Sequence, residues 1–119
     1  MGRPISQEER AAIHWTLSDA FVDNDVNYAV IARDTADYDR DAIEHILYAE
    51  VAPVCHTNLE TVIPPIWSCF DPASLEIQIQ AMLEKRQRSR FRRYLGTLHI
   101  RWLRFRYAYL WREITRYYP

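Results

Sequence analysis

Hydrophobic residues recur along most of the chain at the spacing of a helix face, and no segment alternates between apolar and polar residues as a strand would. Ser6 and Glu9 form a capping-box pattern, which predicts that a first helix begins here. The acidic segment 23–25 predicts the end of that helix and the cap of a short second one. A third helix is expected from Asp39 to Pro53, because proline disrupts a helix interior.

The second half of the chain is predicted to hold two further helices. Two adjacent prolines place residues 53–71 in a loop, and Pro72 after an aspartate is typical of a helix start. The fourth helix should end near Gln87, and either Ser89 caps a long last helix that reaches Tyr118 or the two helices run together. The pattern predicts an all-α fold, a single domain over residues 1–119 built as a compact bundle of about five helices with a long C-terminal helix.

The last helix carries apolar residues on two faces. At about 100° per residue, one face is interpreted as the stripe that packs into the core: Phe91, Tyr94, Leu95, Leu98, Trp102, Phe105 and Tyr109. The second face comprises Ile100, Leu103, Tyr107, Leu110, Trp111 and Ile114. A helix that is apolar on both sides lies at the centre of a bundle or forms an interface. The expected core consists of Leu17, Phe21, Ile46, Leu47, Trp67, Phe70, Leu95, Leu98 and Trp102.

Charge is divided unevenly along the chain, although the net charge is only −1. Residues 1–84 contain 4 basic and 15 acidic side chains, whereas residues 85–119 contain 11 basic side chains and a single acidic one. Asymmetry of this kind indicates either a charged partner or pairing between the two parts of the same chain.

The acidic residues exceed what helix capping requires, which makes them candidates for a surface that contacts a cationic partner. The predicted partner-binding residues are Asp19, Asp23, Asp25, Asp34, Asp37, Asp41 and Glu44. The alternative is that these carboxylates pair with arginines of the same chain, such as Arg86, Arg90 and Arg93.

The basic residues favour a second hypothesis, because arginine makes forked contacts to phosphate as well as to carboxylate. The candidate nucleic-acid-binding residues are Arg86, Arg90, Arg93, Arg101 and Arg104. Arginines in the first turn of a helix oppose its dipole, so an acidic group is expected beside them.

Catalytic and metal-binding patterns are missing from the sequence. Cys55, His56 and Cys69 lack the paired spacing of zinc ligands, and with only two glycines no phosphate-binding loop can form. Glu44 and His45 are neighbours on a helix and point to different faces. We therefore predict no catalytic site, no metal and no cofactor. The lack of a long apolar run predicts a cytoplasmic protein that does not contact the membrane.

Residues 17–70 resemble a family of short bacterial proteins of unknown function. The resemblance lies in the segments Leu17-Ser18 with Phe21 and Asp23, Ile31-Ala32, Ile46-Leu47, Glu50-Val51, Pro53-Val54 with Asn58, and Trp67 with Phe70-Asp71. The chain departs from the family pattern at Pro65-Ile66 and Cys69, where the family has Gly-Glu and Gly. The resemblance implies a helical fold and a bacterial origin, and it implies no activity.

These features lead to an expected function as a non-catalytic interaction protein of the immunity or antitoxin kind. Such a protein would occlude a bacterial toxin through its acidic face, with charge speeding association and apolar contacts slowing release. The alternatives are a nucleic-acid-binding protein that uses the C-terminal arginines, and a structural homodimer joined through the last helix.

Overall fold

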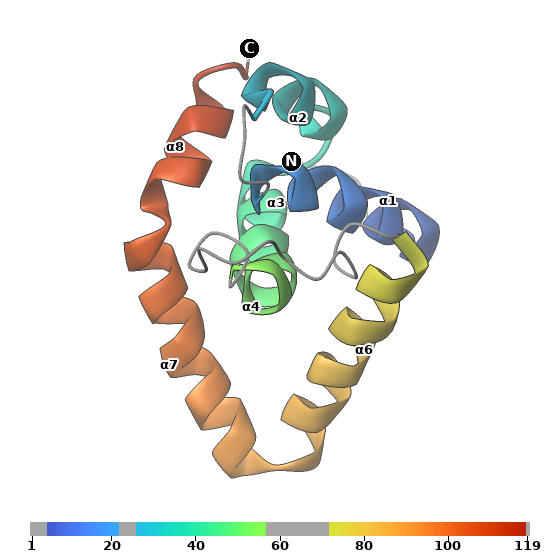
Figure 1. The fold of residues 1–119 in the computed structure, drawn as a ribbon, viewed down its shortest axis with the longest axis vertical. Helices are drawn as coiled ribbons and strands as arrows, with labels where there is room; N and C mark the ends of the chain where they lie inside the picture. The colour runs from blue at the N-terminus through green and yellow to red at the C-terminus, as the bar shows by residue number, and fades with distance from the viewer. Residues whose placement is uncertain (1–4, 22–25, 57–71, 119) are drawn as a thin grey trace, which may run out of the picture.

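The computed structural model describes residues 5–21, 26–56 and 72–118, and every regular element in these ranges is a helix. The all-α prediction is therefore confirmed (Figure 1). The elements are α1 (Gln7–Ser18), the 3₁₀ turn Asp19–Phe21, α2 (Tyr28–Thr35), α3 (Arg40–Ile46), the π-helical segment Leu47–Val51, α4 (Ala52–Cys55), α6 (Pro72–Arg88), α7 (Arg90–Arg106) and α8 (Ala108–Thr115).

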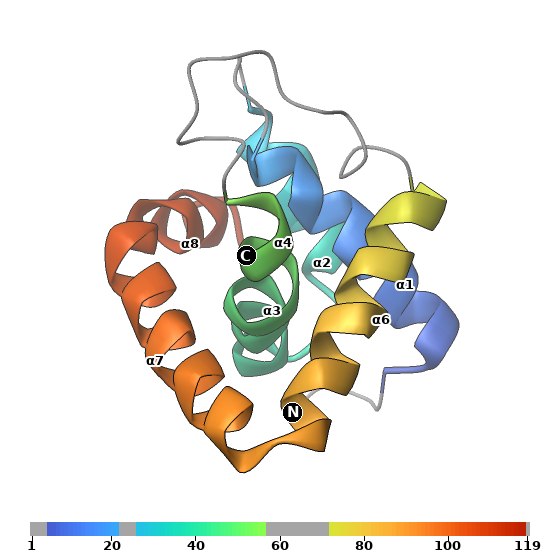
Figure 2. The same ribbon diagram turned by 60° about the horizontal axis from the view of Figure 1, so that its bottom comes forward.

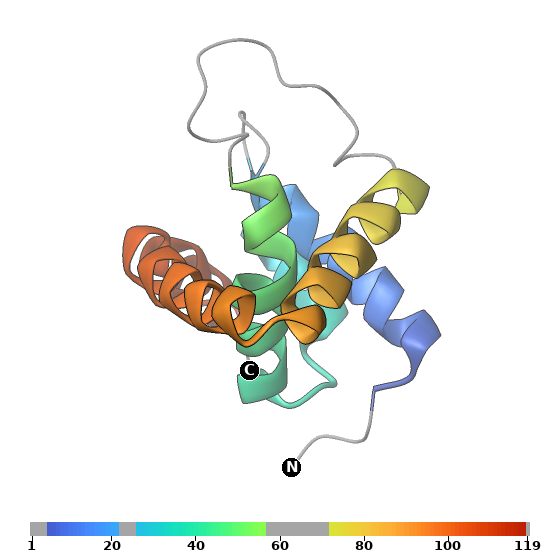
Figure 3. The same cartoon turned by 90° about the horizontal axis from the view of Figure 1, so that it is seen from below.

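Helices α6 and α7 form the two arms of a V that meet near Ser89, and α8 extends the α7 arm as far as α2 (Figure 1). The continuous column of α3, the π-helical segment and α4 lies between these arms, as Figures 2 and 3 show from two further directions. Helix α1 packs against both the π-helical segment and α6. The column is thus enclosed by the other helices.

Side-chain caps mark the helix starts that the sequence predicts. Ser6 and Glu9 form the expected capping box, and the Asp39 carboxylate accepts from the Ala42 amide at 3.2 Å. Ser89 caps α7 by accepting from the Arg92 amide at 3.3 Å. Helix α2 differs, because its cap is Asn27, and the predicted segment 23–25 lies outside the described residues.

The third helix ends near Pro53 as predicted, although Pro53 itself lies inside it, since the helix continues through the π-helical segment into α4 and reaches Cys55. Proline has no N–H, so in an α-helix the carbonyl four residues earlier, that of Ala49, would lose its donor. Here the Arg86 guanidinium donates to the Ala49 carbonyl oxygen at 2.7 Å. A side chain from α6 thus replaces the missing backbone donor.

The expected long last helix is divided into α7 and α8 at Tyr107. The buried Tyr48 hydroxyl donates to the Tyr107 carbonyl oxygen at 2.7 Å and satisfies it at the break. The Tyr107 ring is itself buried and lies edge-on to Phe21, with 6.1 Å between the ring centroids. The bend therefore directs one residue of the C-terminal arm into the core.

The core confirms Leu17, Phe21, Ile46 and Leu47 as buried, and corrects the orientation of the C-terminal arm. Leu95, Leu98 and Trp102 are exposed, so their assignment to the core is wrong. The buried residues come from the second apolar face: Leu103, Tyr107, Leu110 and Ile114. Trp67 and Phe70 lie outside the described residues.

Gly96 explains which face of α7 turns inward. It lies seven residues before Leu103 and so on nearly the same side of the helix, at about 100° per residue. A Cβ atom at Gly96 would lie 2.9 Å from the Arg86 Nε atom and 3.3 Å from its Cδ atom. Because α7 approaches the Arg86 side chain with its glycine side, Leu103 faces inward and the stripe containing Leu98 faces out.

None of the helices in the described ranges combines the length and hydropathy that a membrane crossing requires.

Candidate functional site

The outward stripe of α7 forms an uninterrupted apolar surface, which we call the α7 face and which comprises Phe91, Tyr94, Leu95, Leu98, Trp102 and Phe105. The exposed fraction of these side chains ranges from 42% for Leu98 to 85% for Phe105. Single exposed hydrophobic residues are ordinary, whereas a contiguous row with aromatic members is typical of a binding surface. The α7 face is the largest departure from an ordinary soluble surface in the described part of the chain.

The five candidate nucleic-acid-binding arginines have different surroundings. Arg86 is held by the Ala49 carbonyl, and Arg104 pairs with Glu44 at 3.0 Å. Arg90, Arg93 and Arg101 are exposed, and no described carboxylate pairs with them. The structure thus brings three of the predicted arginines to the surface of α7, and two of them, Arg90 and Arg101, lie beside the α7 face at about 100° per residue.

The predicted acidic surface is present only in part. Asp19, Asp34, Asp37 and Asp41 are exposed, whereas Glu44 is engaged by Arg104. The pKa of Asp19 is raised by partial burial and by the nearby charge of Asp34, so these two carboxylates lie close enough to repel. Asp23 and Asp25 lie outside the described residues.

Among the described residues, the alternative in which the predicted acidic residues pair with the chain's own arginines is seen only at Glu44 and Asp34. Arg86, Arg90 and Arg93 pair with none of the predicted acidic residues there, and the ion pairs that join the acidic and basic parts are Glu44–Arg104 and the local pair Glu84–Arg88. Asp34 contacts Arg33 at 3.3 Å, where both side chains are exposed and the pair contributes little.

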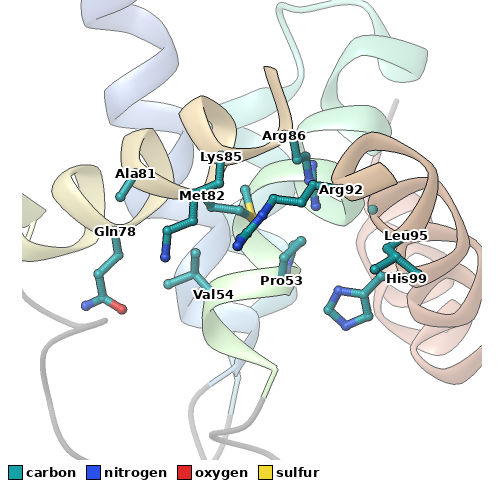
Figure 4. A pocket seen from close by; sticks show the side chains of 11 residues that line it. Pro53, Val54, Gln78, Ala81, Met82, Lys85, Arg86, Arg92, Leu95 and His99 are labelled. Carbon is teal, nitrogen blue, oxygen red and sulfur yellow. The ribbon is translucent and has the colours of Figure 1, made fainter. Parts of the chain in front are cut away.

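A basic cleft opens beside the α7 face, between α4, α6 and α7 (Figure 4). Its volume is about 700 Å³, and the described residues of its lining include Lys85, Arg86, Arg92 and His99 but no acidic side chain. Leu95 belongs both to this cleft and to the α7 face. The two features therefore form one continuous surface along the V.

A second cluster of charges lies inside the protein, where α1, the π-helical segment and α6 meet. We call it the ionic cluster, and it consists of Arg10, His14, Glu50 and Glu76. The Glu50 carboxylate accepts from Arg10 Nε at 2.9 Å and from His14 Nε2 at 2.7 Å, and Arg10 Nη2 also pairs with it. The other ring nitrogen of His14, Nδ1, pairs with Glu76. His14 is fully buried and Glu50 almost so.

Each charge of the ionic cluster is compensated within it. Burial by itself would raise the pKa of Glu50, but hydrogen bonds from His14 and Arg10 outweigh it and lower that pKa to about 2. Burial would likewise lower the pKa of His14, yet the two carboxylates raise it above its usual value. His14 is thus stabilised as an imidazolium that donates to both carboxylates, an arrangement that joins three elements.

The ionic cluster does not stand out in the sequence, because its members are far apart there. Glu50 carries one detectable signal, since it is the only charged residue in the apolar run from Ile46 to Cys55. A charge at such a position is almost never buried without a partner. The sequence does not reveal that this partner is His14, because His14 is one of several histidines that occur singly along the chain.

Metal binding has no basis in the described ranges, since they contain no group of three His, Cys, Asp or Glu side chains that could hold an ion. Cys55 is buried, which is common for cysteine, and Cys69 lies outside the described residues.

The model of a family defined by a domain of unknown function (DUF7079) matches residues 8–117 of the chain. The chain belongs to this family, which agrees with its resemblance to an uncharacterised family of helical proteins. No curated protein and no solved structure matches it.

Proposed function

We propose that the chain is a non-catalytic protein-binding module of the immunity or antitoxin kind, which neutralises a bacterial toxin in the cytoplasm of the producing cell by covering it. The α7 face is the observation that carries this proposal. Phe91, Trp102 and Phe105 are large, exposed and in line, and aromatic side chains of this kind dominate the binding energy of protein interfaces. A row of exposed apolar side chains of this kind is unfavourable in water and is typical of a surface that a partner covers.

The charges around the α7 face specify the kind of surface that it fits. Arg90 and Arg101 lie along one edge of the face at about 100° per residue, so a complementary partner surface has an apolar ridge with carboxylates beside it. Self-pairing through this face would bring the same arginines together, which favours a different protein over a second copy. The proposal therefore assigns anchoring to the α7 face.

The acidic residues have a separate part in the proposal. Asp34, Asp37 and Asp41 are exposed, so they attract the cationic region of a partner over a distance and orient its approach. This contribution changes the association rate more than the lifetime of the complex.

The test begins with identification of the partner by affinity capture, followed by binding measurements with the purified partner. Trp102→Ala with Phe105→Ala should weaken binding at least about tenfold, because interface aromatics each contribute on the order of 1–2 kcal/mol or more. Ile77→Ala is the matched control, since Ile77 is 70% exposed but lies on α6, apart from the α7 face. Unchanged affinity in the double variant would refute the α7 face as the anchor.

The acidic contribution is tested separately with Asp34→Asn, Asp37→Asn and Asp41→Asn combined. The association rate should fall, and the fall should shrink as salt rises, because screening acts beyond about 8 Å at physiological ionic strength. A salt-independent loss, or none, would contradict the steering role.

Nucleic-acid binding is the second candidate, favoured by exposed arginines that alternate with exposed aromatic rings along α7. It predicts an affinity for single strands whose logarithm falls with the logarithm of salt by about 0.7 per phosphate contacted. Submicromolar binding at physiological salt would favour it over a protein partner. A concentration-dependent dimer that Trp102→Ala abolishes would instead identify the structural homodimer.

A further inference from the structure

The basic cleft has the dimensions of a small-molecule site. Its volume of about 700 Å³ falls in the range of roughly 300–1,000 Å³ that is common for such sites. Helices α6 and α7 form its walls, and Pro53 and Val54 of α4 lie at its base (Figure 4).

Two cationic side chains converge on this space without a carboxylate to balance them. Lys85 extends from α6 and Arg92 from α7, and both reach toward Val54 (Figure 4). Both side chains are exposed, and neither pairs with any carboxylate in the described part of the chain. Like charges brought to one concave surface repel, and an anion between them removes that repulsion.

Helix stability accounts for Lys85 but not for Arg92. Lys85 lies in the last turn of α6, where the helix dipole favours a cation. Arg92 lies in the first turn of α7, where the dipole opposes a cation and favours an anion. An anion in the cleft would satisfy the helix end and the two side chains together.

Arg86 differs from these two because it is already engaged. Its guanidinium is fixed to the Ala49 carbonyl, and burial lowers its pKa. Arg86 forms part of the wall of the cleft and adds positive potential, but it does not offer a ligand a pair of free N–H donors. The groups available to a ligand are therefore Lys85 and Arg92, with the His99 ring at one side of the cleft.

Apart from Gln78, the remaining lining is apolar, which limits what the anion can be. Val54, Met82 and Leu95 lie beside the cationic groups and offer a surface for hydrocarbon. Inorganic phosphate or sulfate would leave this surface wet, whereas an anionic group on an apolar body would cover it.

We propose that this cleft binds a small organic anion, a carboxylate or phosphate monoester whose oxygen atoms lie between Lys85 and Arg92 and whose apolar body packs on Val54, Met82 and Leu95. The site goes beyond the proposed protein-binding function and does not rest on it, because its residues are defined by the cleft alone.

The test is a titration of the full chain, followed by NMR and calorimetry, with four probes: phenyl phosphate, phenylacetate, inorganic phosphate and benzyl alcohol. The two organic anions should bind saturably and at least about tenfold more tightly than the other two, which lack either the apolar body or the charge. Whichever organic anion binds more tightly identifies the headgroup. Equal weakness of all four probes would overturn the site.

Combined Lys85→Gln and Arg92→Gln should weaken binding of the preferred probe at least about tenfold, while the melting temperature stays within the error of the wild type. The matched control is Arg90→Gln with Arg101→Gln, which removes the same charge from exposed positions of α7 outside the cleft. An equal loss in both double variants would show that overall charge, rather than the cleft, attracts the anion, and would refute the proposal.

Discussion

The ionic cluster and the basic cleft lie on either side of α6 and use charge in opposite ways. In the cluster, His14 and Arg10 meet Glu50 and Glu76 at a largely buried position, and every charge has a partner. In the cleft, Lys85 and Arg92 face solvent with no carboxylate among the described residues of the lining. The cluster joins charges that are far apart in the sequence, whereas Lys85 and Arg92 are seven residues apart, and the cluster is closed while the cleft is open.

This difference indicates what each region contributes. A buried charge that loses its partner is costly, so the ionic cluster must remain intact for the chain to fold. An exposed cation without a partner costs little and can bind an external anion. Paired charges here belong to the architecture, and unpaired ones are candidates for function.

The largest expected effect is that of Glu50→Gln. This change leaves Arg10 and His14 without their shared carboxylate and should lower the free energy of unfolding by roughly 3 kcal/mol. This value is at the lower end of the range for a broken buried ion pair, because Arg10 reaches water. Urea unfolding measures it. The combined Lys85→Gln and Arg92→Gln variant is the comparison and should stay within about 0.5 kcal/mol of the wild type. Similar losses of unfolding free energy in the two variants would show that the closed and open regions do not differ in their contribution to stability.

A smaller effect is expected from Gly96→Ala. This substitution tests the close contact between Gly96 of α7 and Arg86 of α6. The added Cβ atom would lie 2.9 Å from Arg86 Nε, and Arg86 cannot move freely because it is bound to the Ala49 carbonyl. We expect a loss of roughly 1 kcal/mol, the overpacking cost reduced by the higher helix propensity of alanine. In an Arg86→Ala background the same change should become stabilising. If Gly96→Ala changes the free energy of unfolding equally in both backgrounds, the contact with Arg86 is not the reason that this position requires glycine.

The smallest effect concerns pH. Because the pKa of His14 is raised in the folded state, its contribution to stability is complete below about pH 6.5, the ordinary value, and is lost as pH rises through the folded-state pKa. The free energy of unfolding should thus decline as pH rises above about 6.5, as urea unfolding at several pH values would measure. His14→Gln should flatten the decline, whereas His45→Gln, at an exposed position of α3, should preserve it. A decline that persists in His14→Gln would assign it to another group.

Much of the fold can be predicted from local signals. Helix caps at Ser6, Asp39 and Ser89 act within a few residues, so the sequence identifies them directly. The spacing of apolar residues likewise reveals two faces on the last helix. It does not reveal which face is buried, because that depends on Arg86 of another helix lying across Gly96.

The candidate sites are less predictable for the same reason. Pro53 indicates a helix end in sequence, and only a guanidinium supplied from α6 allows the helix to continue. The cleft depends on the angle between α6 and α7, which neither helix encodes by itself. The charge pattern predicts that Arg90, Arg93 and Arg101 are exposed. The ionic cluster cannot be predicted in this way, because its prediction requires knowing which helices pack against one another.

The ionic cluster also has a consequence for folding kinetics. Its hydrogen bonds join residues 36, 40 and 62 positions apart, so each requires closure of a long loop before it can form. Contacts of such separation form late, after nearby helices have begun to associate. Interactions absent from the transition state slow unfolding without accelerating folding. We therefore expect the cluster to prolong the lifetime of the native state, and the capped helices to set how quickly that state is reached.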